Sequence, residues 1–158
     1  MPSSNAAEYV IEEIYANRYN TTTTSRKNIG DIYVNDIPIN IKSNNIEKNN
    51  YSPNLISAKR AFDYLTNTNN QLKFLFVSYQ SKDYQVHILD EQEVWVDHIS
   101  WDCLAIQCQG NGVIQMKSPL IIDESQTREQ WLEGLREKYL DYIQRQRKKL
   151  DRLEAVVS

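Results

Sequence analysis

Cysteine and long apolar runs are both scarce in this chain of 158 residues, and each scarcity excludes a class of protein. Cys103 and Cys108 are the only cysteines, too few for a disulfide framework or a zinc site, so we expect a reduced, cytoplasmic setting. No apolar run is long enough to span a bilayer. The N-terminus also lacks a basic region followed by an apolar one, so the sequence indicates neither a membrane protein nor secretion.

A large excess of charge of one sign is also missing, because 18 basic and 21 acidic residues give a net charge of −3. This balance argues against a protein that merely coats nucleic acid. The charges are unevenly spread, since basic residues crowd the C-terminal end and acids gather between Asp83 and Asp102. The distribution allows phosphate contacts on one face, but a solvated helix surface would show the same pattern.

What is present is the composition of a soluble globular protein, with 41% hydrophobic and 25% charged residues. The length favours one domain over residues 1–158, with room for one substantial core. The order of segments predicts an α+β fold with a central mixed sheet flanked by helices. The predicted elements are a helix capped by Asn5, a hairpin over 30–42, a helix starting at Pro53, strands over 72–79 and 84–89, a hairpin over 104–117, and a long helix capped by Thr127.

Residues 30–42 contain the strongest candidate for a functional site in the sequence. Apolar and polar residues alternate there, so Asn40 and Lys42 share one face of a strand while isoleucines occupy the other. Asn35-Asp36 supplies a tight turn, and Asp31 opens the first strand. An acid at one strand start, with an oxygen ligand two residues before a lysine on the neighbouring strand, can hold a divalent metal beside a phosphate. The alternative is a surface hairpin with a solvated lysine.

The pattern of Asp31, a spacer and Asn40-Ile41-Lys42 resembles the PD-(D/E)xK motif of restriction endonucleases. Further segments resemble the HincII/HpaI type of these enzymes, in the same order, namely Ser52–Ala58, His98–Trp101 with Ala105–Gln109, Gly110–Lys117 and Thr127–Trp131. The resemblance implies a restriction-endonuclease-like core and a Mg²⁺-dependent Type II restriction endonuclease. Such an enzyme would cut double-stranded DNA at a short palindrome, leaving blunt ends. Because a palindrome needs two active sites, we expect a homodimer.

The resemblance also assigns roles to residues. Asp31, Asn40 and Ile41 would hold Mg²⁺, a cation that prefers oxygen ligands and usually keeps several waters. Lys42 would lie beside the attacking water and stabilise the charge that develops on the phosphate. In the family an acid of the first helix often approaches the metal site, and Glu12 is the candidate here. A solvated helix acid is the equal alternative for Glu12.

Specific DNA contacts would come from two regions rich in amides, which can donate and accept together as base edges demand. The first region is the asparagine-rich loop over 43–51 and the segment after it, although a plain turn is the alternative there. The second resembles the base-reading region of the family. The predicted DNA-binding residues are Asn44, Asn45, Lys48, Asn50, Tyr51, Ser52 and Asn54 in the first region, and His98, Ser100, Cys103, Gln107 and Gln109 in the second.

Asn40 departs from the family pattern, which has an acid at this place. An amide can offer a carbonyl oxygen to Mg²⁺ but adds no negative charge. Three interpretations stay open: a natural enzyme that works with a neutral ligand, a substitution that inactivates the enzyme, and a DNA-binding protein that no longer cuts. A homing endonuclease of the same fold is a further alternative, which would differ in target length and oligomeric state.

Overall fold

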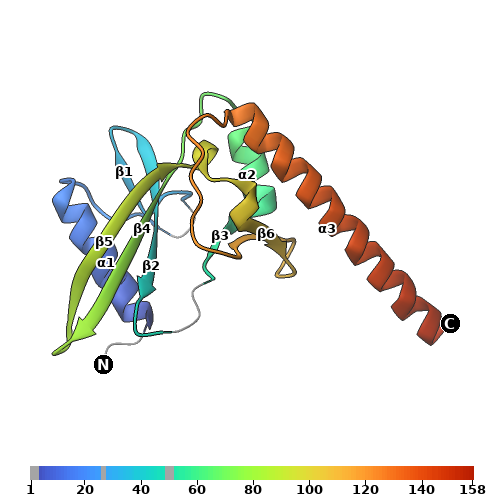
Figure 1. Ribbon diagram of the computed structural model, residues 1–158, viewed down its shortest axis with the longest axis horizontal. Coiled ribbons are helices and arrows are strands. Elements are labelled where there is room, and N and C mark those ends of the chain that lie inside the picture. Colours follow the sequence, from blue (N-terminus) through green and yellow to red (C-terminus); the bar gives the residue numbers. More distant parts are fainter. Residues whose placement is uncertain (1–3, 26–27, 49–51) are drawn as a thin grey trace. The chain divides into compact units, whose positions relative to one another are not determined.

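The computed structural model describes residues 4–25, 28–48 and 52–158, and its contacts divide the chain into two compact units. The first unit consists of Met1–Tyr51 and Gln71–Val96, and the second of Ser52–Asn70 and Asp97–Ser158. Each unit therefore combines two separate stretches of the chain, as the colours in Figure 1 show. The predicted α+β class and the mixed sheet are confirmed. Within the described ranges, no helix is both long and apolar enough to cross a membrane.

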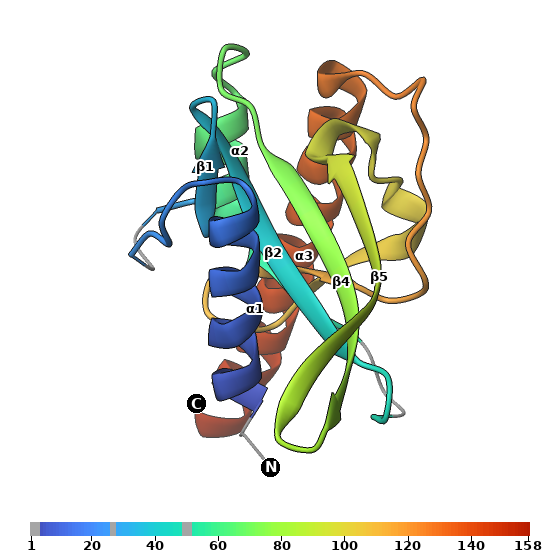
Figure 2. The same cartoon turned by 90° about the vertical axis from the view of Figure 1, so that its left-hand side faces the viewer.

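The first unit is a four-stranded sheet with one helix against it. Its elements are α1 (Ser4–Arg18), β1 (Ile32–Val34), β2 (Ile37–Asn45), β4 (Lys73–Lys82) and β5 (Gln85–Trp95). The strand order is β1-β2-β4-β5, in which β2 and β4 are parallel and the other neighbours are antiparallel. Helix α1 lies along one face of this sheet (Figure 2). There its Ile11 and Tyr15 form one buried cluster with Ile32, Ile39 and Ile41.

The hairpin between β1 and β2 follows the prediction closely. Asn35 and Asp36 both have positive φ angles, 52° and 65°, which is the backbone that a two-residue hairpin turn requires. Asp31 lies one residue before β1 instead of opening it, because the strand begins at Ile32. The main-chain N–H of Asp31 still donates to the carbonyl of Ile39 at 2.9 Å, so Asp31 remains tied to β2.

The second unit is a small antiparallel sheet with two helices. Its elements are β3 (Asn54–Ser57), α2 (Ala58–Leu65), the 3₁₀ turn η2 (Trp101–Cys103), β6 (Leu104–Gln107), β7 (Val113–Met116) and α3 (Arg128–Val157), and the 3₁₀ turn η1 (Val96–His98) leads into it. The strand order is β3-β7-β6. Trp101 and Trp131 pack with their ring centroids 5.1 Å apart, and the indole N–H of Trp101 donates to the carbonyl of Trp131.

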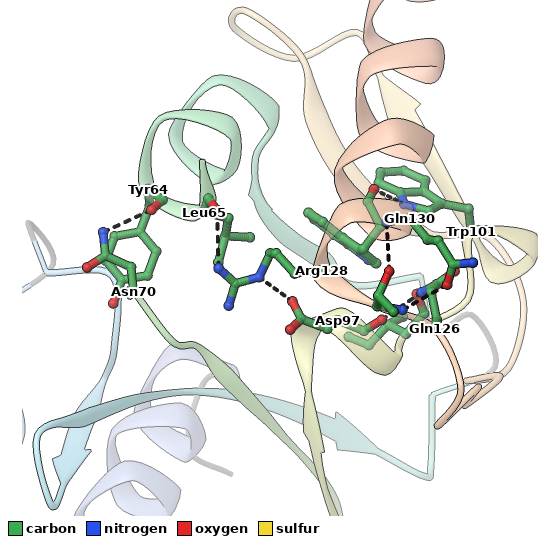
Figure 3. Close-up of polar contacts among 11 residues, drawn as sticks. Tyr64, Leu65, Asn70, Asp97, Trp101, Gln126, Arg128 and Gln130 are labelled. Carbon is green, nitrogen blue, oxygen red and sulfur yellow. Dashed lines mark hydrogen bonds and ion pairs between the residues drawn. The ribbon is translucent and has the colours of Figure 1, made fainter. Parts of the chain in front are cut away.

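A polar network joins the start of α3 to the rest of this unit (Figure 3). Arg128 forms an ion pair with Asp97 at 2.5 Å and donates to the carbonyl of Leu65 at the end of α2. The Gln126 amide donates to the carbonyls of Asp97 and Ile99. The predicted capping box at Thr127 is confirmed, because its hydroxyl accepts from the N–H of Gln130 while the Gln130 side chain accepts from the N–H of Thr127.

Several predicted boundaries were wrong. The helix predicted from Pro53 starts only at Ala58, because residues 54–57 form β3 and Ser57 caps α2 by accepting from the N–H of Arg60. The predicted asparagine-rich loop over 43–51 begins inside β2, which pairs with β4 as far as Asn45. The strand predicted over 84–89 runs on to Trp95. Helix α1 starts at Ser4, so Asn5 lies within the helix and is not its N-cap.

Candidate active site

Asp31 lies against the part of β2 that carries Asn40 and Lys42, two of the other predicted catalytic residues. Its Oδ2 accepts the main-chain N–H of Ile41 at 2.6 Å. Burial raises the pKa of the Asp31 carboxyl, while the Ile41 N–H and the positive charge of Lys42 lower it. The carboxyl is therefore poorly hydrated, and the neighbouring lysine favours its ionised form.

Lys42 is likewise partly shielded from solvent. Burial lowers the pKa of its ammonium group, and the negative charges of Asp31, Glu8 and Glu12 oppose that shift, in this order of importance. Among the acids of the first helix, the sequence predicted a role for Glu12 and none for Glu8. The signal was available, because Glu8 and Glu12 are one turn apart and so share a face of α1. The structure thus brings three of the predicted catalytic residues and Glu8 into one electrostatic neighbourhood.

Asn40 has one satisfied and one unsatisfied side-chain atom. Its Nδ2 donates to the main-chain carbonyl of Ile29 at 3.1 Å. Because a carbonyl oxygen can only accept, the amide nitrogen must face Ile29. The Oδ1 atom is then inaccessible to solvent and has no hydrogen-bond partner in the described part of the chain. A buried acceptor left in this way costs about 1–3 kcal/mol, so a donor or a cation at this place would relieve a real penalty.

Asp31 and Asn40 carry oxygen atoms of the kinds that Mg²⁺ prefers as ligands. Asp31 offers a carboxylate and Asn40 the unpartnered amide oxygen, whereas Ile41 has its side chain in the core and could offer only its main-chain carbonyl. Within the described ranges there is no group of three His, Cys, Asp or Glu residues that could hold a metal ion by itself. Mg²⁺ tolerates so small a set, because it commonly binds through one or two carboxylates and keeps several waters.

Three predicted DNA-binding residues lie at or just beyond the end of β2. Asn44 and Asn45 are the last residues of the strand and are half-buried. The Oδ1 of Asn45 accepts the N–H of Glu47 at 3.0 Å, which closes a turn and leaves Lys48 exposed. Asn50 and Tyr51 fall outside the described residues.

The second unit brings two other predicted DNA-binding residues together. Asn54, the first residue of β3, donates through Nδ2 to the Oε1 of Gln109 at 2.8 Å, and both side chains are exposed. Gln107, at the end of β6, is exposed as well. This hydrogen bond leaves the Asn54 side-chain oxygen and the Gln109 amide N–H groups available to other partners. Together they offer an acceptor and donors, as hydrogen bonding to base edges requires.

Of the remaining predicted residues of this unit, Ser52 is exposed and the other three are less accessible. Cys103 has no exposed surface, and the nearly buried Ser100 accepts through its hydroxyl from the N–H of Asp102 and caps η2. Burial therefore argues against contact of either side chain with a base. His98 is half-buried, and Ser52 contributes its carbonyl to a hydrogen bond from the Gln115 side chain.

The structure thus divides the predicted residues between a group of predicted catalytic residues on the first unit and an exposed amide pair on the second. No protein-family model and no curated protein matches this chain.

Proposed function

We propose that this chain is a Mg²⁺-dependent endodeoxyribonuclease of the PD-(D/E)xK type, with its active site at Asp31, Asn40 and Lys42. One observation carries the proposal: a buried amide oxygen without a partner lies on the strand that also bears Lys42 and against which a poorly hydrated carboxyl is held. A buried oxygen without a partner does not stabilise a purely structural hairpin. In a site that binds a cation beside a phosphate, the same oxygen can serve as a ligand.

The residues can divide the work of phosphodiester hydrolysis between them. When bound, Mg²⁺ would supply a more acidic water and offset the charge on the phosphoryl oxygens. Lys42 donates to the attacking water or to a phosphoryl oxygen. Burial lowers the pKa of its ammonium group, and three nearby carboxylates oppose that shift by favouring the charged form. We assign Lys42 an electrostatic role and not that of the base. Glu8 and Glu12 hold negative charge near the lysine from α1.

The substrate we propose is double-stranded DNA, cut at a short palindrome by a homodimer, as in Type II restriction enzymes. The support is the exposed pair of Asn54 and Gln109 with the nearby Gln107, since amides pair well with adenine in the major groove. A two-fold dimer would present this surface twice, in the symmetry of a palindromic site.

A second candidate is a protein that binds DNA without cutting it. The observation in its favour is the hydrogen bond that Asn40 donates to the Ile29 carbonyl, which an ionised acid at this position could not donate. The strand therefore accommodates the amide well, although the same contact also suits an enzyme with a neutral ligand.

Cleavage of a mixed plasmid and phage DNA panel, with Mg²⁺, Mn²⁺ or EDTA, tests the proposal. The proteins to compare are the wild type, Asn40→Asp, Lys42→Met as the inactive control, and Asn69→Asp as a control for added charge at an exposed asparagine. Discrete metal-dependent fragments from the wild type or Asn40→Asp, and none from Lys42→Met, are expected. If neither the wild type nor Asn40→Asp cuts DNA while both still bind it, the second candidate is correct. Equal cutting by Lys42→Met would refute the assigned site.

A further inference from the structure

The apolar face of α3 that its own unit covers continues, uncovered, towards the end of the helix. In the first half, Trp131, Leu135 and Tyr142 are buried. From residue 147 onward every residue is exposed, and Leu150 and Leu153 are 63% and 55% exposed. Figure 1 shows these last turns running on beyond the other elements of the second unit. About three turns of helix therefore present leucine and valine to solvent.

The residues along this face follow the repeat of a coiled coil. Apolar or amide residues recur at alternating intervals of four and three, at Tyr139, Ile143, Gln146, Leu150, Leu153 and Val157. In heptad terms the a positions are held by Ile143, Leu150 and Val157, and the d positions by Tyr139, Gln146 and Leu153. Two helices paired along such a seam bury both copies of it.

Part of the seam is covered by other residues of the same unit. The Tyr139 hydroxyl donates to the carbonyl of Asn111, in the turn between β6 and β7, at 3.0 Å. The Sγ of Cys108, just before that turn, lies 3.6 Å from the Gln146 Oε1. The unit itself thus covers the seam near Tyr139, whereas Leu150, Leu153 and Val157 remain for a partner.

The charges that flank the seam fit a second copy of the same helix. Lys149 occupies the g position and Glu154 the e position that follows it. In a parallel, in-register pair, Lys149 of each copy faces Glu154 of the other, which makes the same attractive contact twice. Gln146, whose Oε1 accepts from the Cys108 thiol of its own unit, would lie opposite its own counterpart across the axis. An antiparallel pair would instead set Gln146 against the apolar Val157.

We propose that the C-terminal turns of α3, centred on Leu150 and Leu153, are the dimer interface of this protein, paired in parallel with a second copy. The interface is self-complementary, so it closes at two chains and leaves no free edge. It does not depend on nuclease activity. A two-fold axis along α3 also meets the symmetry requirement of a palindromic substrate.

Sedimentation equilibrium of the full chain tests the interface. Leu150→Glu and Leu153→Glu place charges in the seam, and Gln144→Glu adds the same charge at an exposed position away from it. We expect a concentration-dependent dimer for the wild type and Gln144→Glu, and a dissociation constant at least about a hundredfold higher for either leucine variant. Far-UV circular dichroism verifies that the variants remain folded. A monomer at every concentration, or a dimer that survives both leucine changes, would overturn the proposal.

A charge exchange tests the parallel register. Lys149→Glu and Glu154→Lys should each weaken the dimer about three- to tenfold at low salt, because each creates two like-charge contacts. The double variant should recover the wild-type constant, since the pair is restored with its signs exchanged. A double variant as weak as the sum of the single changes would exclude this register. A monomeric wild type whose Leu150→Glu variant loses DNA binding would assign the face to DNA and refute the dimer.

Discussion

The side-chain amide of Asn40 donates a hydrogen bond to the main-chain carbonyl of Ile29, and the oxygen of the same amide is buried without a partner among the residues described. The amide nitrogen thus has a hydrogen-bond partner, whereas the amide oxygen has none in the described part of the chain. An aspartate could not make the first contact, because it would set a carboxylate oxygen against a carbonyl oxygen. A cation would satisfy the second atom in either residue.

Asn40→Asp should therefore destabilise the metal-free protein by about 1–3 kcal/mol, through loss of the Ile29 hydrogen bond and the burial of a second carboxylate near Asp31. Mg²⁺ should raise the melting temperature of this variant more than that of the wild type, because the added charge strengthens cation binding. Thermal unfolding in EDTA and in Mg²⁺ measures both effects. An equal Mg²⁺ response in the wild type, Asn40→Asp and the Asn69→Asp control would contradict a cation site here.

Lys42 should control the ionisation of Asp31. Burial already raises the pKa of Asp31 above its ordinary 3.8, and the lysine counteracts that rise, so Lys42→Met should raise this pKa further. A carboxyl whose pKa is raised in the folded state favours folding below pH 3.8, and this contribution is lost as pH rises through the folded pKa. The Lys42→Met protein should therefore lose stability relative to the wild type as pH rises above 3.8. Carbon-detected NMR titration of Asp31 checks the pKa, and an unchanged value would contradict the contact.

The ion pair between Arg128 and Asp97 should be worth far more than the surface pair between Arg145 and Asp141. The side chains of the first pair are 16% and 24% exposed, and Arg128 also satisfies the Leu65 carbonyl. Arg128→Gln should cost about 2–3 kcal/mol, because it leaves a partly buried carboxylate unpaired. Arg145→Gln, which breaks a pair that is 58% and 67% exposed, should cost less than about 1 kcal/mol. Urea unfolding of both variants makes the comparison, and similar losses would refute it.

Gly134→Ala should destabilise the protein, although alanine in place of glycine within a helix usually stabilises by up to about 1 kcal/mol. A Cβ at this position would lie 2.7 Å from Nε1 of Trp101 and in still closer contact with its Cδ1. A hydrogen bond restrains the indole from moving away, because its N–H donates to the Trp131 carbonyl at 2.9 Å. A lower urea midpoint with altered tryptophan fluorescence is expected. An increase in stability would mean that the indole can move aside.

Local chemistry made part of the fold predictable. The turn at Asn35 and Asp36 and the capping box at Thr127 were predicted correctly, because each depends on residues within a few positions of one another. The last residues of β2 were taken for a loop, because their strand pairing is with β4, more than thirty residues along the chain. The segment after Pro53 has spacing that suits a helix, yet the antiparallel pairing of β3 with β7 makes it a strand.

The same division holds for the candidate site. The spacing of Asp31, Asn40 and Lys42 identified the strand and its polar face from the sequence. The bond from Asn40 to Ile29 and the influence of Glu8 depend on where the preceding loop and α1 fold, which periodicity does not specify. The burial of Cys103 depends on the 3₁₀ turn before β6, and this turn has no strong sequence signal.

The alternation of the two units along the chain has a consequence for synthesis on the ribosome. The first unit is complete only when Val96 has emerged, and by then β3 and α2 have been made without the rest of their own unit. Their apolar residues, Leu55, Ile56 and Leu65, stay uncovered until the remaining sixty or so residues follow, which takes about 3–12 s at typical elongation rates. A nascent chain arrested in that interval is a natural client for chaperones. For the same reason, no single cut of the chain separates the two units, because at least one of the two fragments then contains segments of both.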